Sequence, residues 1–273
     1  VGSANSDSAA RGGITRVEAD GTETIAFPPP ADETWSTRGM IVDTDARRLW
    51  VCARQVEAGV VTSQRIRTFD LSTGEQELDL DLASAAEGST CNDIAVDSAG
   101  LAYISDSENS RIYRASAEDE TVEVWADDPL LASDLPILGG NGIAVTEDDR
   151  FVILSKTVAS TAPRLLRIDR TDPASISGIT TTPDFVGTAD GMSFLDGDLY
   201  IAIVNPGEIF RLTSEDDWAT AAIASTTAVV GTSTVRPAEG FLYAIYSDIT
   251  AFIVGEPVSP PFRIFRIDLD SFE

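Results

Sequence analysis

Three short segments share one pattern and recur at a fixed interval, which constrains the fold more than any other feature of the chain. Each begins with Asn or Asp beside another polar residue or Gly and runs directly into a short apolar strand. Asn92 lies 49 residues before Asn141, and Asn141 lies 49 residues before Asp190. A second and a third apolar run follow each segment, so every repeat holds several short strands. A period in the forties with several strands per repeat predicts a β-propeller.

Five units of this kind can be counted, and a pair of strands precedes them. The pair covers residues 14–17 and 22–26, with the turn signal Asp20-Gly21 between the strands. Because an open propeller would leave unpaired strand edges, we interpret the pair as the outer half of a further blade. We therefore predict an all-β, six-bladed propeller that forms a single domain over residues 1–273, with its first blade incomplete at the N-terminus. Helix is expected only as single turns near 84–87 and 214–219.

The charge balance excludes several kinds of partner. With 45 acidic and 19 basic residues the chain has a net charge of −26, which repels nucleic acid and anionic membranes. There is no run of 18 apolar residues that would span a membrane. We expect a monomer whose partner is a small molecule. Asp106, Glu108 and the acidic run 118–120 are interpreted as solvated turns.

Histidine is absent, and only two cysteines are present. The absence excludes a Ser-His-Asp triad, a Cys-His pair and any zinc site that uses histidine. Cys52 ends one strand, and Cys91 opens the inner strand of the following repeat. Two buried free thiols are one reading; a disulfide across adjacent blades is the other, and would stabilise the chain by about 4 kcal/mol. As expected for a secreted, acidic protein, we predict that Cys52 and Cys91 are joined, in a secreted or extracytoplasmic protein.

The polar residues that start the repeats suggest a metal site. In a propeller the inner strands line a central channel, so Asn92, Asn141 and Asp190 should point toward the axis at one height. Two amide oxygens and one carboxylate are hard ligands that suit Ca²⁺ or another divalent cation. Gly142 and Gly191 follow two of them, which leaves room and permits unusual backbone angles. The simpler interpretation is that Asn and Asp only cap turns, but three at the same position favour a site.

The order Asn-Asp, Asn-Gly and Asp-Gly at successive inner strands resembles the senescence marker protein/gluconolactonase family of six-bladed propellers. Paraoxonase-like and strictosidine synthase-like proteins are more distant relatives. The resemblance covers nearly the whole chain as a repeat pattern, although each motif is short. It implies a divalent metal in the channel, held by a first-blade Glu, two Asn and an Asp. Asn92, Asn141 and Asp190 match the Asn and Asp positions, and Asp190 would also be the general base.

This sequence departs from the family pattern at two places. The first-blade Glu has no clear counterpart, because we expect the strand that should carry it to lie before Val1, and Arg38 stands at the head of the second unit. The histidines that paraoxonase-like enzymes use are also absent.

Loops between second and third strands should lie over the same rim. They are expected at 53–64, 155–163 and 247–261, the last a proline-rich lid. Lys156 in the second loop, or Arg38, could orient a substrate carboxylate or stabilise an oxyanion. Each cation could equally be a surface or salt-bridged group.

Two functions follow from these features. The first is a metal-dependent hydrolase of a lactone or related ester, in which the metal polarises the carbonyl and Asp190 helps to activate water. The alternative is a non-catalytic propeller that binds a small ligand or a protein partner on its rim, since propellers host both kinds of function.

Overall fold

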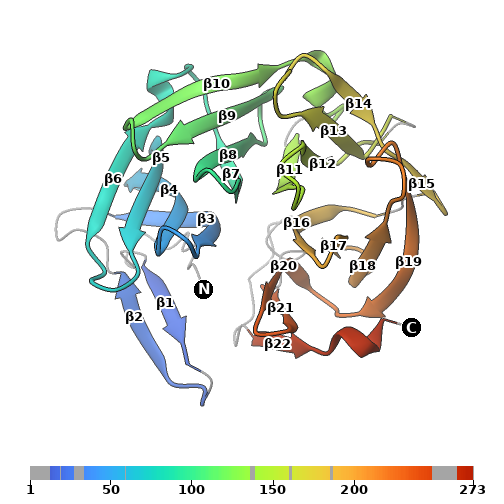
Figure 1. Ribbon diagram of the computed structural model, residues 1–273. Helices are drawn as coiled ribbons and strands as arrows, with labels where there is room; N and C mark the ends of the chain where they lie inside the picture. The colour runs from blue at the N-terminus through green and yellow to red at the C-terminus, as the bar shows by residue number, and fades with distance from the viewer. Residues whose placement is uncertain are drawn as a thin grey trace. The chain divides into compact units, whose positions relative to one another are not determined.

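The computed structural model describes residues 13–18, 20–27, 34–58, 60–135, 139–159, 162–184, 187–247 and 263–272. The chain is the predicted six-bladed β-propeller, with its described strands arranged in six sheets (Figure 1). It divides into two compact units, Val1–Asp127 and Asp128–Glu273. Each unit contains three of the sheets, and each is described by itself below.

The first unit holds a two-stranded sheet and two antiparallel four-stranded sheets. The two-stranded sheet is the predicted hairpin, and it confirms that the first blade is incomplete within the described residues. Its strands are β1 (Ile14–Val17) and β2 (Glu23–Phe27); the second sheet contains β3 (Trp35–Asp43), β4 (Arg48–Glu57), β5 (Val60–Asp70) and β6 (Gln76–Asp81); the third contains β7 (Cys91–Val96), β8 (Leu101–Asp106), β9 (Arg111–Ser116) and β10 (Thr121–Asp127).

The second unit holds the other three sheets. The first contains β11 (Gly140–Val145), β12 (Phe151–Lys156), β13 (Leu165–Asp169) and β14 (Ile176–Gly178). The next contains β16 (Ala189–Leu195), β17 (Asp198–Ile203), β18 (Glu208–Thr213) and β19 (Thr220–Ala228). The last contains β20 (Thr232–Ala238), β21 (Phe241–Tyr246) and β22 (Arg263–Ile267). The short strand β15 (Thr180–Thr182) pairs in parallel with β19 and adds a fifth strand to the middle sheet, which the repeat pattern did not predict.

Helix in the described residues is limited to three 3-10 turns: η1 (Leu82–Ser84), η2 (Pro129–Leu131) and η3 (Leu269–Ser271). The first lies close to the predicted turn at 84–87. The helical turn predicted at 214–219 is wrong, because the segment forms a tight turn in which Ala219 N–H donates to the Asp216 carbonyl. Ser214 and Asp216 accept backbone N–H groups there, as short polar side chains do in turns.

Each unit has apolar cores between neighbouring sheets. Alternate side chains of a strand point to opposite faces, so a sheet can bury apolar residues against a neighbouring sheet of the same unit. In the first unit Trp50, Ile66, Ile94 and Ile104 are fully buried between the second and third sheets. In the second unit Ile153, Met192, Ile201 and Phe210 belong to the corresponding cluster.

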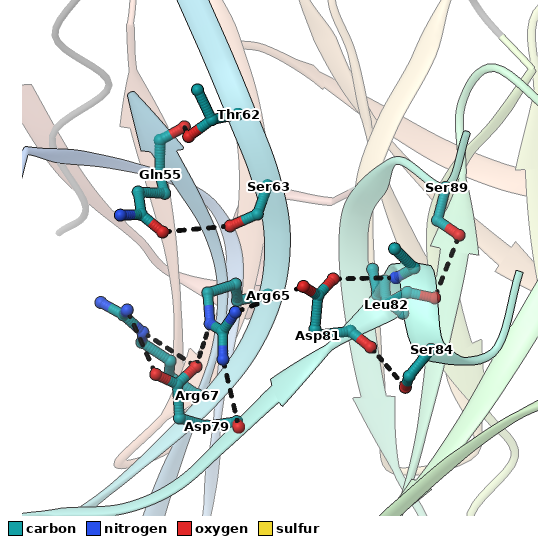
Figure 2. Close-up of polar contacts among 11 residues, drawn as sticks. Gln55, Thr62, Ser63, Arg65, Arg67, Asp79, Asp81, Leu82, Ser84 and Ser89 are labelled. Atoms are coloured by element: carbon teal, nitrogen blue, oxygen red, sulfur yellow. Dashed lines mark hydrogen bonds and ion pairs between the residues drawn. The ribbon is translucent and has the colours of Figure 1, made fainter. Parts of the chain in front are cut away.

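Polar contacts tie the outer strands of the second sheet together (Figure 2). Arg65 and Arg67 of β5 both turn to the carboxylate of Asp79 on β6, and Arg67 also lies 5.0 Å from the ring centre of Trp35. Asp81 accepts the backbone N–H of Ala83 and so caps η1. The arginines in this part of the sheet therefore face carboxylates.

Candidate functional site

The three predicted metal ligands and Arg38 occupy the same kind of irregularity in the backbone. In β7, Cys91 pairs with Asp106 and Ile94 pairs with Ile104, so Asn92 and Asp93 together face one residue of β8. This is a β-bulge, a feature that re-aims side chains and is frequent beside active sites. Bulges with the same two-to-one count lie at the start of β11 and β16 and after Thr37 in β3, and at the start of β20 the single residue Ser233 is inserted. Their first residues are Arg38, Asn92, Asn141, Asp190 and Ser233.

Three of these bulges, those of β3, β11 and β16, have glycine at the second position because neighbouring inner strands approach closely there. A Cβ on Gly142 of β11 would overlap the Asp190 carbonyl oxygen of β16, and one on Gly191 would overlap the Thr234 side chain of β20. In the first unit, a Cβ on Gly39 would lie 2.6 Å from the Asn92 carbonyl oxygen. None of the three glycines has a positive φ. Of the two reasons that the sequence suggested for Gly142 and Gly191, the need for room is therefore the correct one.

The second unit brings Asn141 next to Asp190. The Asn141 side chain is 8% exposed, and its Nδ2 donates to the Ala189 carbonyl at 2.8 Å. Because a carbonyl only accepts, this bond fixes the nitrogen end of the amide and turns Oδ1 to the other side. Asp190 is the residue after Ala189 and is partly buried. An amide oxygen and a carboxylate are thus positioned on adjacent bulges.

The first unit places Asn92 differently. Its bulge packs against the bulge of Arg38 and Gly39 on β3, so the neighbouring strand of its own unit has a cation rather than a carboxylate at the first bulge position. That Asn92 joins Asn141 and Asp190 around one ion stays a prediction.

Amide and carboxylate oxygens suit a hard cation, and these residues supply only a few of them. Among the described residues, no group of three or more Cys, Asp or Glu side chains is placed to hold a metal ion. A cation at the bulges would therefore depend on amide oxygens together with the single carboxylate of Asp190. Such a mixture of carboxylate and amide ligands is one that Ca²⁺ accepts.

A second arginine, which the sequence analysis missed, lies beside Arg38. Residues 53–64 were predicted to be a loop, but β4 and β5 continue as a long hairpin through Glu57 and Val60. The β-branched residues of this segment favour extended structure. Arg54 therefore lies on a strand, where it pairs with Ser36 of β3. Only the three-dimensional pairing reveals this neighbour of Arg38.

Lys156, predicted to bind substrate, is 4% exposed at the end of β12. Its ammonium donates to the carbonyl oxygens of Leu130 and Ala132, which lie in and just after η2. Burial lowers the pKa of Lys156, and the carboxylate of Asp134 opposes that shift. This placement favours a structural role, in which the lysine holds η2 against β12. The predicted lid at 247–261 lies outside the described residues apart from Ser247.

Asp106 is the clearest polar residue that the sequence analysis misjudged. The prediction of a solvated turn is wrong for it, since its side chain is fully buried at the end of β8. Its carboxylate accepts the backbone N–H groups of Thr90, Glu108 and Asn109, and it lies 2.9 Å from the hydroxyl of Tyr113. A buried carboxylate is tolerated when it is hydrogen-bonded in this way. Burial, with a smaller contribution from Asp106, raises the pKa of Tyr113.

The predicted disulfide between Cys52 and Cys91 is present. It joins β4 to β7, and hence two neighbouring blades, with 5.5 Å between the Cα atoms. Both residues are fully buried. No helix in the described part of the chain is long and apolar enough to cross a membrane.

Comparison with known proteins identifies relatives. Among solved structures, the chain is similar to the major allergen Mala s 1 of Malassezia sympodialis, with a TM-score of 0.69 and 15% identity over 93% of this chain and 85% of that one. It is also similar to a gluconolactonase from Xanthomonas campestris, with a TM-score of 0.55 and 17% identity over 84% and 74% of the two chains. A virginiamycin B lyase from Staphylococcus aureus gives a TM-score of 0.53 at 14% identity over 84% and 83%. At these identities the likeness concerns the fold.

No curated protein sequence matches the chain. The sequence profile of the SMP-30/gluconolactonase/LRE-like region matches residues 9–234, which include the bulges of Asn92, Asn141 and Asp190. The profile match spans most of the chain, and the propeller fold and the predicted polar strand heads agree with it. The chain therefore belongs to the SMP-30/gluconolactonase/LRE-like family.

Proposed function

We propose that the protein hydrolyses a lactone or a related ester at a site formed by Asn92, Asn141 and Asp190. The observation that carries this proposal is that the three side chains hold the same bulge position on β7, β11 and β16. Family membership supports the proposal, and the gluconolactonase of similar fold is a protein that acts on a lactone. Asn141 and Asp190 lie on adjacent bulges, which supports their joint use.

The residues divide the chemistry between them. Asp190 supplies the negative charge, accepts a proton from a water molecule and so activates that water to attack the carbonyl carbon. The new bond forms between the water oxygen and that carbon. The ester C–O bond breaks, and the leaving oxygen recovers the proton, so the product is a hydroxy acid. Asn92 and Asn141 contribute amide oxygens, and for Asn141 the bond to the Ala189 carbonyl fixes the orientation of the amide.

Asn92, Asn141 and Asp190 are the residues that would hold a divalent cation, which we propose is Ca²⁺. When bound, the cation would polarise the carbonyl of the substrate. A single carboxylate gives weak binding, because affinity for Ca²⁺ rises with the number of charged ligands.

The decisive experiment replaces Asp190 by Asn. Hydrolysis of a panel of γ- and δ-lactones and aryl esters would be followed with Ca²⁺ and with EDTA. Because a general base contributes about 10²- to 10⁴-fold, Asp190→Asn should lose at least about 100-fold in rate. The matched control is Asp198→Asn, which removes only an ion pair to Arg211 on the neighbouring strand and should keep the parent rate. Full activity of Asp190→Asn on every lactone that the parent hydrolyses would refute the role of Asp190.

A second function is favoured by one observation. Arg38 stands at the bulge of β3, where a further carboxylate would strengthen cation binding. The protein would then bind a small ligand or a protein partner on its rim without converting it. If the parent hydrolyses none of the panel with any of Ca²⁺, Mg²⁺, Mn²⁺ or Zn²⁺, this second function replaces the first.

We also propose a location, a class of partner and an oligomeric state for the protein. The disulfide supports a secreted or extracytoplasmic location, since disulfides persist in oxidising compartments. The net charge of −26 favours a small-molecule partner over nucleic acid or an anionic membrane. We further propose a monomer, which light scattering coupled to gel filtration would test.

A further inference from the structure

The bulges of β3, β7, β11 and β16 each face one small residue on the second strand of their sheet. The two residues of the bulge lie opposite this single residue, because the register shifts there. All four facing side chains are fully buried. They are Cys52 on β4, Ser105 on β8, Ser155 on β12 and Ala202 on β17. Equivalent positions opposite the bulges therefore carry different chemistry.

Both serines bond to the backbone of the bulge that they face. The Oγ of Ser105 accepts the N–H of Asp93 at 3.1 Å. The hydroxyl of Ser155 donates to the carbonyl oxygen of Gly142 at 3.3 Å. Asp93 and Gly142 are the second residues of their bulges and directly follow the two asparagines of the proposed site. Because a bulge disrupts the ladder of backbone bonds, each hydroxyl holds the strand where its regular pairing is interrupted.

Among these four bulges, the two that face a serine are those that begin with an asparagine. The bulge that faces Ala202 begins with Asp190. The bulge that faces Cys52 begins with Arg38. An asparagine amide accepts only at its oxygen, and its NH₂ group only donates, so a rotated amide no longer serves as a ligand. A carboxylate accepts at both oxygens, so orientation matters more for the two asparagines than for Asp190.

We propose that Ser105 and Ser155 are positioning residues, which hold the two asparagine bulges so that each amide keeps one orientation. For Asn141 the serine acts together with the bond from its Nδ2 to the Ala189 carbonyl. That the oriented amide oxygens serve a cation or a substrate rests on the proposed function. The positioning itself depends only on bonds within each unit.

The test is NMR of the protein labelled with ¹⁵N in its asparagine side chains. The chain has five asparagines, and Asn92→Asp and Asn141→Asp each remove one NH₂ pair and so assign it. Ser155→Ala should broaden or split the Asn141 pair and speed its exchange with water by about threefold or more, because one bond that holds the bulge is lost. Ser105→Ala should affect the Asn92 pair in the same way. Each variant should leave the pair of the other asparagine unchanged.

The matched control is Ser116→Ala. Ser116 is buried and accepts the N–H of Asp119 at 3.1 Å, as Ser105 accepts that of Asp93, but it lies beside the turn between β9 and β10. The control should leave both asparagine pairs as they are in the parent, and urea unfolding checks that all variants are folded. A second readout is Ca²⁺ binding by isothermal titration calorimetry. Ser105→Ala and Ser155→Ala should each weaken it by about three- to tenfold, and the control should not change it.

Each outcome decides the proposal. An asparagine pair that stays sharp and exchanges as in the parent overturns the role of the serine that faces its bulge. Equal broadening in the Ser116→Ala control overturns both roles, since the change would then be a general loosening of the fold. A parent that binds no Ca²⁺ and hydrolyses no lactone refutes the proposed function alone, and the asparagine pairs, recorded without a metal, still decide the positioning.

Discussion

Two joints between neighbouring blades, one in each unit, are built on the same backbone but are held by different chemistry. We call the contact of the β3–β6 and β7–β10 sheets the first joint, and the contact of the β11–β14 and β15–β19 sheets the second joint. In both, a bulge glycine, Gly39 or Gly142, presses against the bulge of the next inner strand. The first joint adds the Cys52–Cys91 disulfide. The second has no cysteine, and apolar side chains fill it.

This difference shows which features of a joint come from the repeat and which are particular to one pair of blades. The close approach of inner strands is common to both joints, because it follows from the bulge and its glycine. The covalent link is found where Arg38 and Arg54 bring two positive charges together, and the second joint instead carries Asn141 and Asp190.

The largest expected effect is the loss of that link. The double variant Cys52→Ala/Cys91→Ala opens a loop closed over 39 residues and should be less stable by about 4 kcal/mol. Urea unfolding with and without a reductant measures this. The reductant should destabilise the parent by a similar amount and leave the variant unchanged. A variant as stable as the parent would show that the first joint does not depend on its disulfide.

A bulge glycine should matter in both joints. Gly142→Ala forces a methyl group onto the Asp190 backbone, and Gly39→Ala forces one to within 2.5 Å of the Asp93 Cα. Overpacking against backbone should cost about 3 kcal/mol in each case. Gly88→Ala is the benchmark, since it has open space but a φ of +71° and should cost about 1 kcal/mol. If the urea midpoint fell for only one of the two variants, Gly142→Ala or Gly39→Ala, the two joints would not share a dependence on the bulge glycine.

Asp106 is a buried carboxylate on the β7–β10 side of the first joint, where it accepts the backbone N–H groups of Thr90, Glu108 and Asn109. Asp106→Asn replaces an acceptor oxygen by an NH₂ group and leaves buried N–H donors without a partner, which should cost about 2 kcal/mol. As a control, Glu118→Gln in the turn between β9 and β10, where the residue is exposed, should change stability by less than about 0.5 kcal/mol. If both variants unfold at the same urea concentration, the buried carboxylate contributes nothing to the stability of the protein.

The smallest expected effect is on how the free energy of unfolding depends on pH. The pKa of Tyr113 is raised by burial, so on raising the pH the unfolded chain releases this proton before the folded one does. The folded state then holds more protons, and stability should fall as the pH rises above about 10, by at most about 1.4 kcal/mol per pH unit. Tyr113→Phe should remove this part of the alkaline loss. An identical slope in parent and variant would show that Tyr113 titrates alike in both states.

The repeat made the strand heads, the incomplete first blade and the disulfide partners predictable, because equal spacing places equivalent residues on equivalent strands. Asn92, Asn141 and Asp190 were found in this way, and the bulges explain why they share a position. Arg54 and Asp106 could not be found from the sequence. Their importance comes from contacts with other strands and turns, with Ser36 and Arg38 in one case and with Thr90 and Tyr113 in the other.

Lys156 shows a related limit. It follows a buried strand, as a rim residue would, but η2 covers it and supplies carbonyl oxygens to its ammonium. A segment without repeat character, such as η2, has no sequence signature that fixes where it packs. The same is true of β15, which crosses to the next sheet after only one residue beyond β14.

The first residue of each bulge can change its chemistry without a change in the fold. Its first residue belongs to none of the described apolar clusters between sheets, so a substitution there leaves the packing of the blades in place. The five strands that share the feature already carry a cation, two amides, a carboxylate and a hydroxyl at this position. A new specificity could therefore arise by single exchanges at these positions. For protein engineering they form a small combinatorial library, with Gly39, Gly142 and Gly191 held constant.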